Sequence, residues 1–270
     1  MVFNCPNLRE ISLEFSRQEH DSTDLITVFD GLGKTCRRIQ NIHIASLKLS
    51  HPVVLALTAA NFRELRMLSL VLGKEITDAS VAAISSSYSD LQLLDLSGSS
   101  ITDSGIGMIC NVLPDTLSRL LLALCPNVTS SGIQYATAQL PLLELLDCGM
   151  TISDPASDNQ TIPERSSNPQ QTQLINGQKM FIKHSRLKKL SLWGCSSLDT
   201  LFLNCPELKD LNLNSCNNLH PERLALQCPK LQLVHASGCQ GPLTKAIRKQ
   251  VLKNFTGGNN MISKRLADCS

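Results

Sequence analysis

The stretch Leu187-Lys188-Lys189-Leu190-Ser191-Leu192-Trp193-Gly194-Cys195 has leucine at its first, fourth and sixth residues and cysteine at its ninth. The same pattern, LxxLxLxxC, is present over Leu117–Cys125 and Leu208–Cys216, and a looser version runs over Leu231–Cys239. Successive side chains of a strand point to opposite faces. The LxL segment therefore predicts a short strand with its leucines on a buried face and the residues between them on an open face.

Looser copies raise the number of repeats to nine, starting at residues 8, 39, 65, 91, 117, 143, 187, 208 and 231. The intervals are 31, 26, 26, 26, 26, 44, 21 and 23 residues. A single copy cannot bury its apolar face, so neighbouring copies must stack and share one core. This pattern predicts an α/β leucine-rich-repeat solenoid, or horseshoe, with a parallel sheet on its concave side and helical or extended segments on its convex side.

The return segments of the 26-residue copies begin alike, with Ile76-Thr77-Asp78, Ile101-Thr102-Asp103 and Val128-Thr129-Ser130. Thr, Ser and Asp cap helix starts, and apolar residues then recur every three to four positions, which predicts helices. The copies spaced 21 and 23 residues apart are too short for a full helix. An extended or 3₁₀ return is expected there.

We expect residues 1–256 to form one repeat array, interrupted at about 153–173 by an insertion rich in Pro, Ser, Asn and Gln. That composition is typical of a disordered loop, either a tolerated surface insertion or a docking or phosphorylated segment. No capping segment precedes the first repeat, so the chain is expected to be the C-terminal portion of a longer protein or a truncated form.

An amphipathic helix is expected over 243–256, where an apolar residue recurs every fourth position and lysines and arginine lie between. Such a helix would close the open end of the array. A basic helix on a membrane surface is the alternative. Residues 257–270 are expected to form a flexible tail.

Composition argues against several other classes of protein. The formal net charge is +2, which gives no electrostatic case for nucleic acid. No stretch approaches the roughly 18 uninterrupted apolar residues of a membrane-spanning helix, and no signal peptide is visible. The 11 cysteines therefore predict reduced thiols of a nuclear or cytoplasmic protein. No CxxC pair, phosphate-binding loop or Ser-His or Cys-His spacing is present, so we expect no enzyme, metal or cofactor.

The openings Cys205-Pro206-Glu207-Leu208 and Cys228-Pro229-Lys230-Leu231, with Ile101-Thr102-Asp103-Ser104-Gly105, resemble plant F-box/LRR-repeat proteins. The resemblance implies a non-catalytic subunit of an SCF-type E3 ubiquitin ligase whose repeats hold a protein substrate for proteasomal degradation. In that family an F-box binds the adaptor that links to the cullin. No F-box is found in this sequence, so adaptor and cullin would be reached only through an F-box outside it.

The same repeats are also compatible with two other classes of protein. One is a non-ligase binding scaffold, such as a GTPase-activating or nuclease-inhibiting protein. The other is a receptor for a hormone or small molecule, which would need a pocket lined by several Arg or Lys, whereas only Arg119 and Lys189 point outward.

Strand alternation places the partner-binding residues on the concave face. An apolar stripe is expected across the middle repeats, and a lone Trp stands at an outward position, where partner contacts are favoured. Arg119 and Lys189 would pair with acidic groups of a ligand or with Asp147 or Asp210 on adjacent strands. The predicted site comprises Met67, Val71, Leu93, Arg119, Leu121, Leu145, Lys189, Trp193, Asp210 and Asn212.

Overall fold

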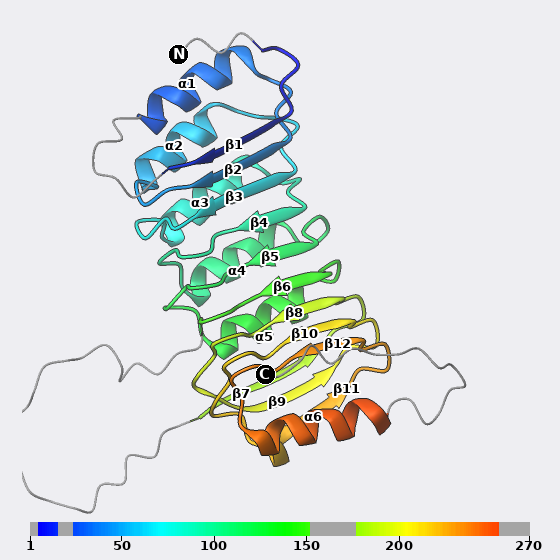
Figure 1. The fold of residues 1–270 in the computed structure, drawn as a ribbon. Helices are drawn as coiled ribbons and strands as arrows, with labels where there is room; N and C mark the ends of the chain where they lie inside the picture. The colour runs from blue at the N-terminus through cyan, green and yellow to red at the C-terminus, as the bar shows by residue number, and fades with distance from the viewer. Residues whose placement is uncertain (1–4, 16–23, 152–176, 254–270) are drawn as a thin grey trace, which may run out of the picture.

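The computed structural model of the chain describes residues 5–15, 24–151 and 177–253. Over these residues the chain winds into a stacked array whose main sheet holds nine parallel strands (Figure 1). In sheet order they are β1 (Glu10–Glu14), β2 (Asn41–Ala45), β3 (Met67–Val71), β4 (Leu93–Asp95), β5 (Arg119–Leu121), β6 (Leu145–Asp147), β8 (Lys189–Ser191), β10 (Asp210–Asn212) and β12 (Leu233–His235).

The convex side changes its structure along the array. In the first half it carries helices α1 (Leu25–Thr35), α2 (His51–Ala59), α3 (Asp78–Ser87), α4 (Asp103–Val112) and α5 (Ser130–Gln139). In the second half it carries a parallel three-stranded sheet of β7 (Gln178–Lys183), β9 (Leu198–Asn204) and β11 (Leu224–Gln227), with the 3₁₀ turn η2 (Pro221–Arg223). The predicted solenoid is confirmed, including its helical and extended return segments.

The last described element, α6 (Gly241–Lys253), packs on β11 and η2 at the C-terminal end of the array. It buries Leu243, Ile247 and Val251 against the core. The expected insertion at 153–173 and tail at 257–270 lie outside the described residues, as do positions 254–256 of the helix expected over 243–256.

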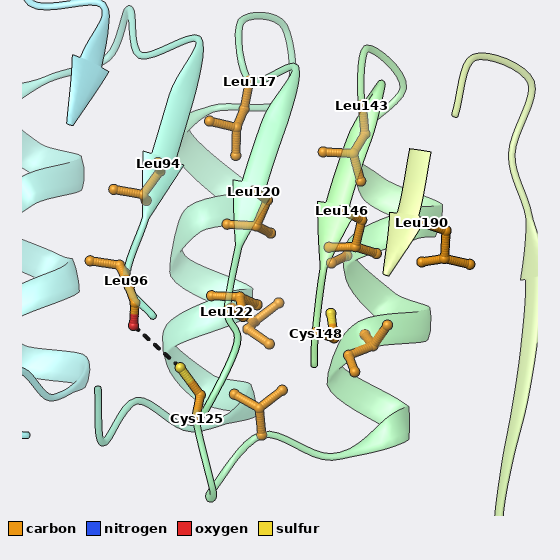
Figure 2. Close-up of a cluster of buried hydrophobic side chains, with 14 of the residues drawn as sticks. Leu94, Leu96, Leu117, Leu120, Leu122, Cys125, Leu143, Leu146, Cys148 and Leu190 are labelled. Atoms are coloured by element: carbon orange, nitrogen blue, oxygen red, sulfur yellow. Dashed lines mark hydrogen bonds between the residues drawn. The ribbon is translucent and has the colours of Figure 1, made fainter. Parts of the chain in front are cut away.

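The repeat register aligns the fourth residue of every copy across the sheet. Leu94, Leu120, Leu146 and Leu190 are consecutive partners in this row and are almost completely buried. Figure 2 shows them side by side between the sheet and the helices, with the leucines of the first and sixth positions above and below. Each such leucine contributes about 1.5–3 kcal/mol of burial free energy, so this column is the core of the array.

In five copies the side chain of the ninth residue donates a hydrogen bond to the carbonyl at the sixth position of the copy before it; these residues are Cys125, Thr151, Cys195, Cys216 and Cys239. Cys125 Sγ lies 3.3 Å from Leu96 O (Figure 2), and Cys216 Sγ lies 3.1 Å from Leu192 O. Thr151 makes the same bond to Leu122 O with its hydroxyl, at 2.7 Å. Burial raises the pKa of the Cys125 and Cys216 thiols, which keeps their protons in place as donors. The cysteine position is therefore a hydrogen-bond position.

The Thr-Asp starts of the convex helices interlock neighbouring repeats. Asp103 at the start of α4 accepts from the backbone N–H of Thr129 at 2.9 Å and from its hydroxyl at 2.6 Å. Asp78 makes the same pair of bonds to Thr102. A Cβ at Gly132 would overlap the Asp103 carboxylate, so glycine follows wherever the preceding repeat supplies this Asp.

Gly132→Ala is expected to lower the free energy of unfolding by about 2 kcal/mol, because the methyl group would displace the Asp103 carboxylate. Gly107 in α4 is the matched control, since nothing lies within 4 Å of its Cβ position. Gly107→Ala is expected to raise stability by about 0.5–1 kcal/mol. Urea unfolding followed by circular dichroism measures both variants, and equal effects would contradict the interlock.

Both edges of the convex sheet are sealed by a glutamine side chain from a neighbouring helix. Gln134 of α5 accepts from Phe181 N at 3.0 Å and donates to Lys179 O at 3.4 Å. Gln250 of α6 accepts from Leu226 N at 2.8 Å and donates to Leu224 O at 2.6 Å. Each glutamine amide thus bonds to the N–H and the C=O of two residues that lie two positions apart on the edge strand. A neighbouring strand would make the same pair of bonds. Edge strands otherwise offer unpaired backbone groups to other chains.

Gln250→Glu is expected to cost about 1–2 kcal/mol of stability, because a carboxylate can still accept from Leu226 N but cannot donate to Leu224 O. Gln232→Glu, at an exposed residue, introduces the same charge and is expected to stay within about 0.5 kcal/mol of the parent chain. Thermal unfolding of the two variants measures the difference in stability between them. A Gln250→Glu chain as stable as the control would show that the seal contributes nothing.

Candidate partner-binding site

The concave face is formed by the third, fifth and seventh residues of each copy. Met67, Leu93, Arg119, Leu145 and Lys189 are successive partners in one row across β3, β4, β5, β6 and β8. Each is half-buried except Lys189, which is exposed. The predicted residues Leu121 and Val71 are half-buried in the fifth and seventh rows. The apolar stripe (Met67, Val71, Leu93, Leu121 and Leu145) is thus spread over three rows, and Arg119 interrupts one of them.

The Arg119 side chain lies along the sheet. Its Nη2 atom is 3.7 Å from Met67 Sδ, two strands away. Because Leu93 stands between these residues in the register, the arginine side chain crosses over it. The aliphatic part of Arg119 therefore covers the middle of the apolar stripe and leaves a guanidinium on the surface.

Trp193 packs against the neighbouring repeat. A Cβ at Gly149 would overlap the indole ring at Nε1, so the ring lies directly on the Gly149 backbone, which is buried. The ring is itself half-buried. Trp193 therefore forms part of the floor of the concave face at the ends of β6 and β8, with one side turned to the repeat.

The fifth row carries a series of polar contacts that was not predicted from the sequence. His43 Nδ1 is 2.8 Å from Ser69 Oγ, and Ser69 Oγ donates to Asp95 Oδ2 at 2.9 Å. The serine proton points at the carboxylate, so the histidine must donate to the hydroxyl. A nucleophilic serine would instead give its proton to the histidine. The 26-residue repeat interval was the signal that could have placed these residues together.

Asp and Asn in the fifth row fix the turn that follows each strand. Asp95 Oδ1 accepts from Ser97 N, Asp147 Oδ1 from Gly149 N and Asn212 Oδ1 from Asn214 N, each at 3.0 Å. The predicted site residue Asn212 therefore already uses its acceptor within the repeat. Asp210, also predicted, lies 3.7 Å from His235 Nε2 through its Oδ1 atom.

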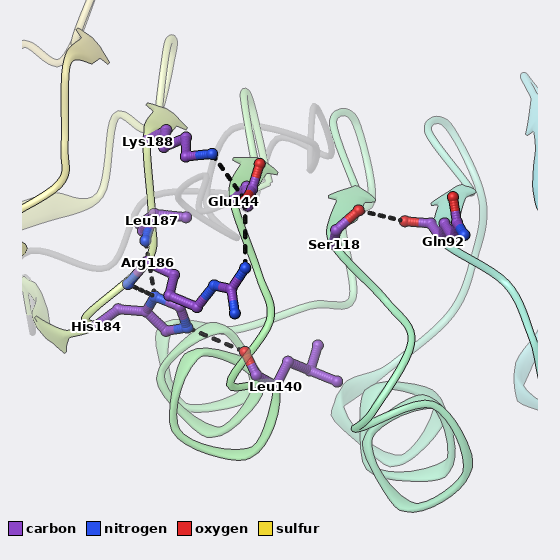
Figure 3. A network of polar contacts seen from close by, with 8 residues as sticks. All are labelled: Gln92, Ser118, Leu140, Glu144, His184, Arg186, Leu187 and Lys188. Atoms are coloured by element: carbon purple, nitrogen blue, oxygen red, sulfur yellow. Dashed lines mark hydrogen bonds and ion pairs between the residues drawn. The ribbon is translucent and has the colours of Figure 1, made fainter.

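Arg119 and Lys189 have no carboxylate within 4.0 Å in the part of the chain that is described. The salt bridges considered for them with Asp147 and Asp210 are therefore not formed. The carboxylate between them is Glu144, and it is bound by Lys188 at 2.8 Å and by Arg186 at 3.7 Å (Figure 3). The hydrogen bond from Lys188 lowers the pKa of Glu144.

A strand-end ridge lies where the strands turn toward the convex side, and sequence reasoning missed it. The eighth residue of a copy has a positive φ in Leu72 (68°), Leu124 (60°) and Met150 (53°). These three residues define the ridge. The equivalent residues include glycines: Gly98, Gly194 and Gly238, with φ of 77°, 69° and 73°. Leu124 and Met150 are 41% and 44% exposed, which is unusual for large apolar side chains.

The positive φ is imposed by stacking. It turns the backbone N–H of the eighth residue toward the next repeat, where Leu124 N donates to Gly149 O at 2.8 Å and Met150 N to Trp193 O at 2.6 Å. Non-glycine residues in this conformation cost about 1–2 kcal/mol, and such strain gathers at functional sites. The sequence signal was a large apolar residue at a position that holds glycine or serine in five other copies, at Ser46, Gly98, Gly194, Ser215 and Gly238.

Leu124→Gly is expected to leave the free energy of unfolding unchanged or raise it by about 1 kcal/mol, because glycine adopts a positive φ without strain. Leu47 is the matched control, since it is 50% exposed and outside the residues with positive φ. Leu47→Gly is expected to lower stability by about 0.5–1 kcal/mol. Guanidinium unfolding of both chains tests the pair, and a larger loss for Leu124→Gly would refute strain at the ridge.

Within the described ranges, no group of three or more His, Cys, Asp or Glu residues could hold a metal ion. In the same ranges, no helix has the length and apolar character required to cross a bilayer. The concave face presents half-buried apolar side chains, the cations Arg119 and Lys189, and backbone turns.

The register, the leucine column and the ninth-position hydrogen bonds define a leucine-rich-repeat protein of the cysteine-containing kind. No family model matches the sequence. The chain is 78% identical over 271 residues to F-box/LRR-repeat protein 17 of Arabidopsis thaliana, with 100% of this chain and 45% of that protein covered. This relationship supports the assignment of the chain to the plant F-box/LRR-repeat proteins and confirms the predicted resemblance. The chain spans about half the length of this relative.

Among solved structures, the chain is similar to one described as the crystal structure of the Rad7 and Elc1 complex in yeast. The TM-score is 0.33 and the identity 15%, with 80% of this chain and 74% of that chain covered. A likeness at this level adds nothing to the argument from the repeats.

Proposed function

We propose that this chain is the substrate-recognition part of an SCF-type E3 ubiquitin ligase and that its concave face holds a protein substrate for proteasomal degradation. The observation that carries the proposal is the open face of the nine-stranded sheet, which combines the apolar stripe with the unpaired cations Arg119 and Lys189. Rigid faces of this kind bind proteins through a few apolar anchors and a charged rim. The F-box/LRR name of the Arabidopsis relative supports a role in protein interaction.

In this proposal the chain performs no chemistry itself. The adaptor and cullin would be reached through an F-box elsewhere in the longer protein, and ubiquitin transfer would be carried out by other subunits. The buried cysteines act as thiol donors to backbone carbonyls, which favours a reducing compartment, the nucleus or the cytoplasm. The alternative is a scaffold or small-molecule receptor that uses the same face outside any ligase.

Affinity capture from plant cells tests the proposal, with the longest chain that the gene encodes and with this chain in parallel. We expect the long form to recover adaptor and cullin, and both forms to share a further protein, the candidate substrate. Failure of the long form to recover any ligase subunit would sink the ubiquitin proposal and leave a binding scaffold of another kind.

Leu121→Asp in the long form is expected to reduce recovery of the shared protein at least about tenfold, because it places a charge in the apolar stripe. Recovery of adaptor and cullin should not change, since they bind elsewhere. Leu55→Asp is the matched control, because Leu55 is 48% exposed on α2, away from the concave face. Equal losses for the two variants would show that the concave face is not the substrate site.

A further inference from the structure

A basic cavity of about 310 Å³ opens at the N-terminal ends of β5, β6 and β8. It is lined by Ser118, Arg119, Glu144, Leu145, Lys188 and Lys189. Three of these side chains are cationic and one is a carboxylate, so the lining has a formal charge of +2 (three minus one). Figure 3 shows the Glu144, Lys188 and Ser118 side of this cavity.

The positive charge of the cavity is not neutralised from within. Glu144 is bound by Lys188 and Arg186, so the carboxylate is shared between two cations. Arg119 and Lys189 remain without a carboxylate within 4.0 Å among the described residues. Ser118 directs its hydroxyl to Gln92 O at 3.0 Å (Figure 3) and leaves its oxygen able to accept.

Next to the two cations the cavity has an apolar wall. Leu145 is half-buried between Arg119 and Lys189 in the same row. Leu121 lies one row further along β5 and is also half-buried. A ligand that fits both surfaces must carry negative charge and an apolar group a few ångströms apart, which is the chemistry of an acidic peptide with interspersed apolar residues.

We propose that the basic cavity binds a Glu- or Asp-bearing segment of the protein partner, with an apolar side chain on Leu145 and carboxylates on Lys189 and on Arg119, whose guanidinium turns from Met67 Sδ toward the ligand. This inference rests on the proposed use of the concave face for protein binding and adds the chemistry of what is bound. The guanidinium of Arg119 suits a bidentate bond to a carboxylate. Lys189 supplies a second, more mobile contact, and Lys188 stays with Glu144 as the rim of the cavity.

The test uses the purified chain and a short fluorescein-labelled peptide in which Glu alternates with Leu, followed by fluorescence anisotropy. We expect saturable binding that weakens as salt is raised, because the contacts are between charges. A peptide with Gln in place of every Glu is expected to bind at least about tenfold more weakly. A peptide of the same sequence with phosphoserine in place of Glu separates a need for carboxylates from a need for any anion.

Arg119→Ala combined with Lys189→Ala is expected to lower the affinity for the Glu-Leu peptide at least about tenfold. Lys179→Ala combined with Lys183→Ala removes the same charge from exposed residues of β7 and is expected to change affinity less than about twofold. Glu144→Gln removes the only carboxylate in the cavity lining and is expected to tighten binding about threefold. A gain of affinity cannot come from misfolding.

Three outcomes overturn the inference: no binding of the Glu-Leu peptide at low salt, equal binding of the Gln peptide, or equal losses in the Arg119/Lys189 and Lys179/Lys183 variants. Stronger binding of the phosphoserine peptide with no binding of the Glu peptide would also overturn it, in favour of phosphate recognition. None of these results depends on recovery of ligase subunits from cells, so failure here and failure of the ubiquitin proposal are separate observations.

Discussion

The stacking of parallel strands in a fixed register is the constraint on which the rest of this molecule depends. Because Leu94 pairs with Leu120, Leu120 with Leu146 and Leu146 with Leu190, a strand residue lies beside the residue that has the same place in the next copy. A leucine therefore needs a leucine beside it, a cysteine donor needs a carbonyl one copy earlier, and a helix-start Asp needs a glycine one copy later. Stability is a sum of such neighbour terms, so each local fit matters as much as the overall pattern.

Most of the fold could be predicted from the sequence because the repeat makes its rules visible several times. The leucine positions gave the strands, the Thr-Asp starts gave the helices, and the short intervals of 21 and 23 residues gave the extended return segments. The glutamine seals could not be predicted. Gln134 on α5 and Gln250 on α6 are not part of the repeating pattern. Their hydrogen bonds depend on how each helix packs against the edge of the convex sheet.

The candidate site was only partly predictable, for a different reason. The alternation of strand residues predicts which side chains point outward but not the direction that a long side chain takes. The contact of Arg119 with Met67 could therefore not be predicted. It also could not show that Trp193 lies on Gly149. The 44-residue interval broke the spacing between Glu144 and Lys188, and only the paired strands reveal that the two residues are neighbours. Whether Arg119 and Lys189 form salt bridges depends on the distances from their side-chain nitrogens to neighbouring carboxylates, and a sequence does not give these distances.

Charge and backbone strain occur together on three neighbouring strands and the turns after them. Arg119 and Lys189 flank Leu145 in the third row, Glu144 and Lys188 bring opposite charges to the strand starts, and Leu124 and Met150 hold a positive φ at the turns. These residues belong to three consecutive strands, β5, β6 and β8, where the convex side changes from helices to a sheet. Positions that only stabilise a repeat should follow the pattern everywhere. Exposed charge and strain that add no burial are expected where a partner, and not the fold, sets the residue. The same three strands carry the basic cavity at their N-terminal ends, and two of the three ridge residues, Leu124 and Met150, follow β5 and β6, so the two surfaces lie at opposite ends of these strands.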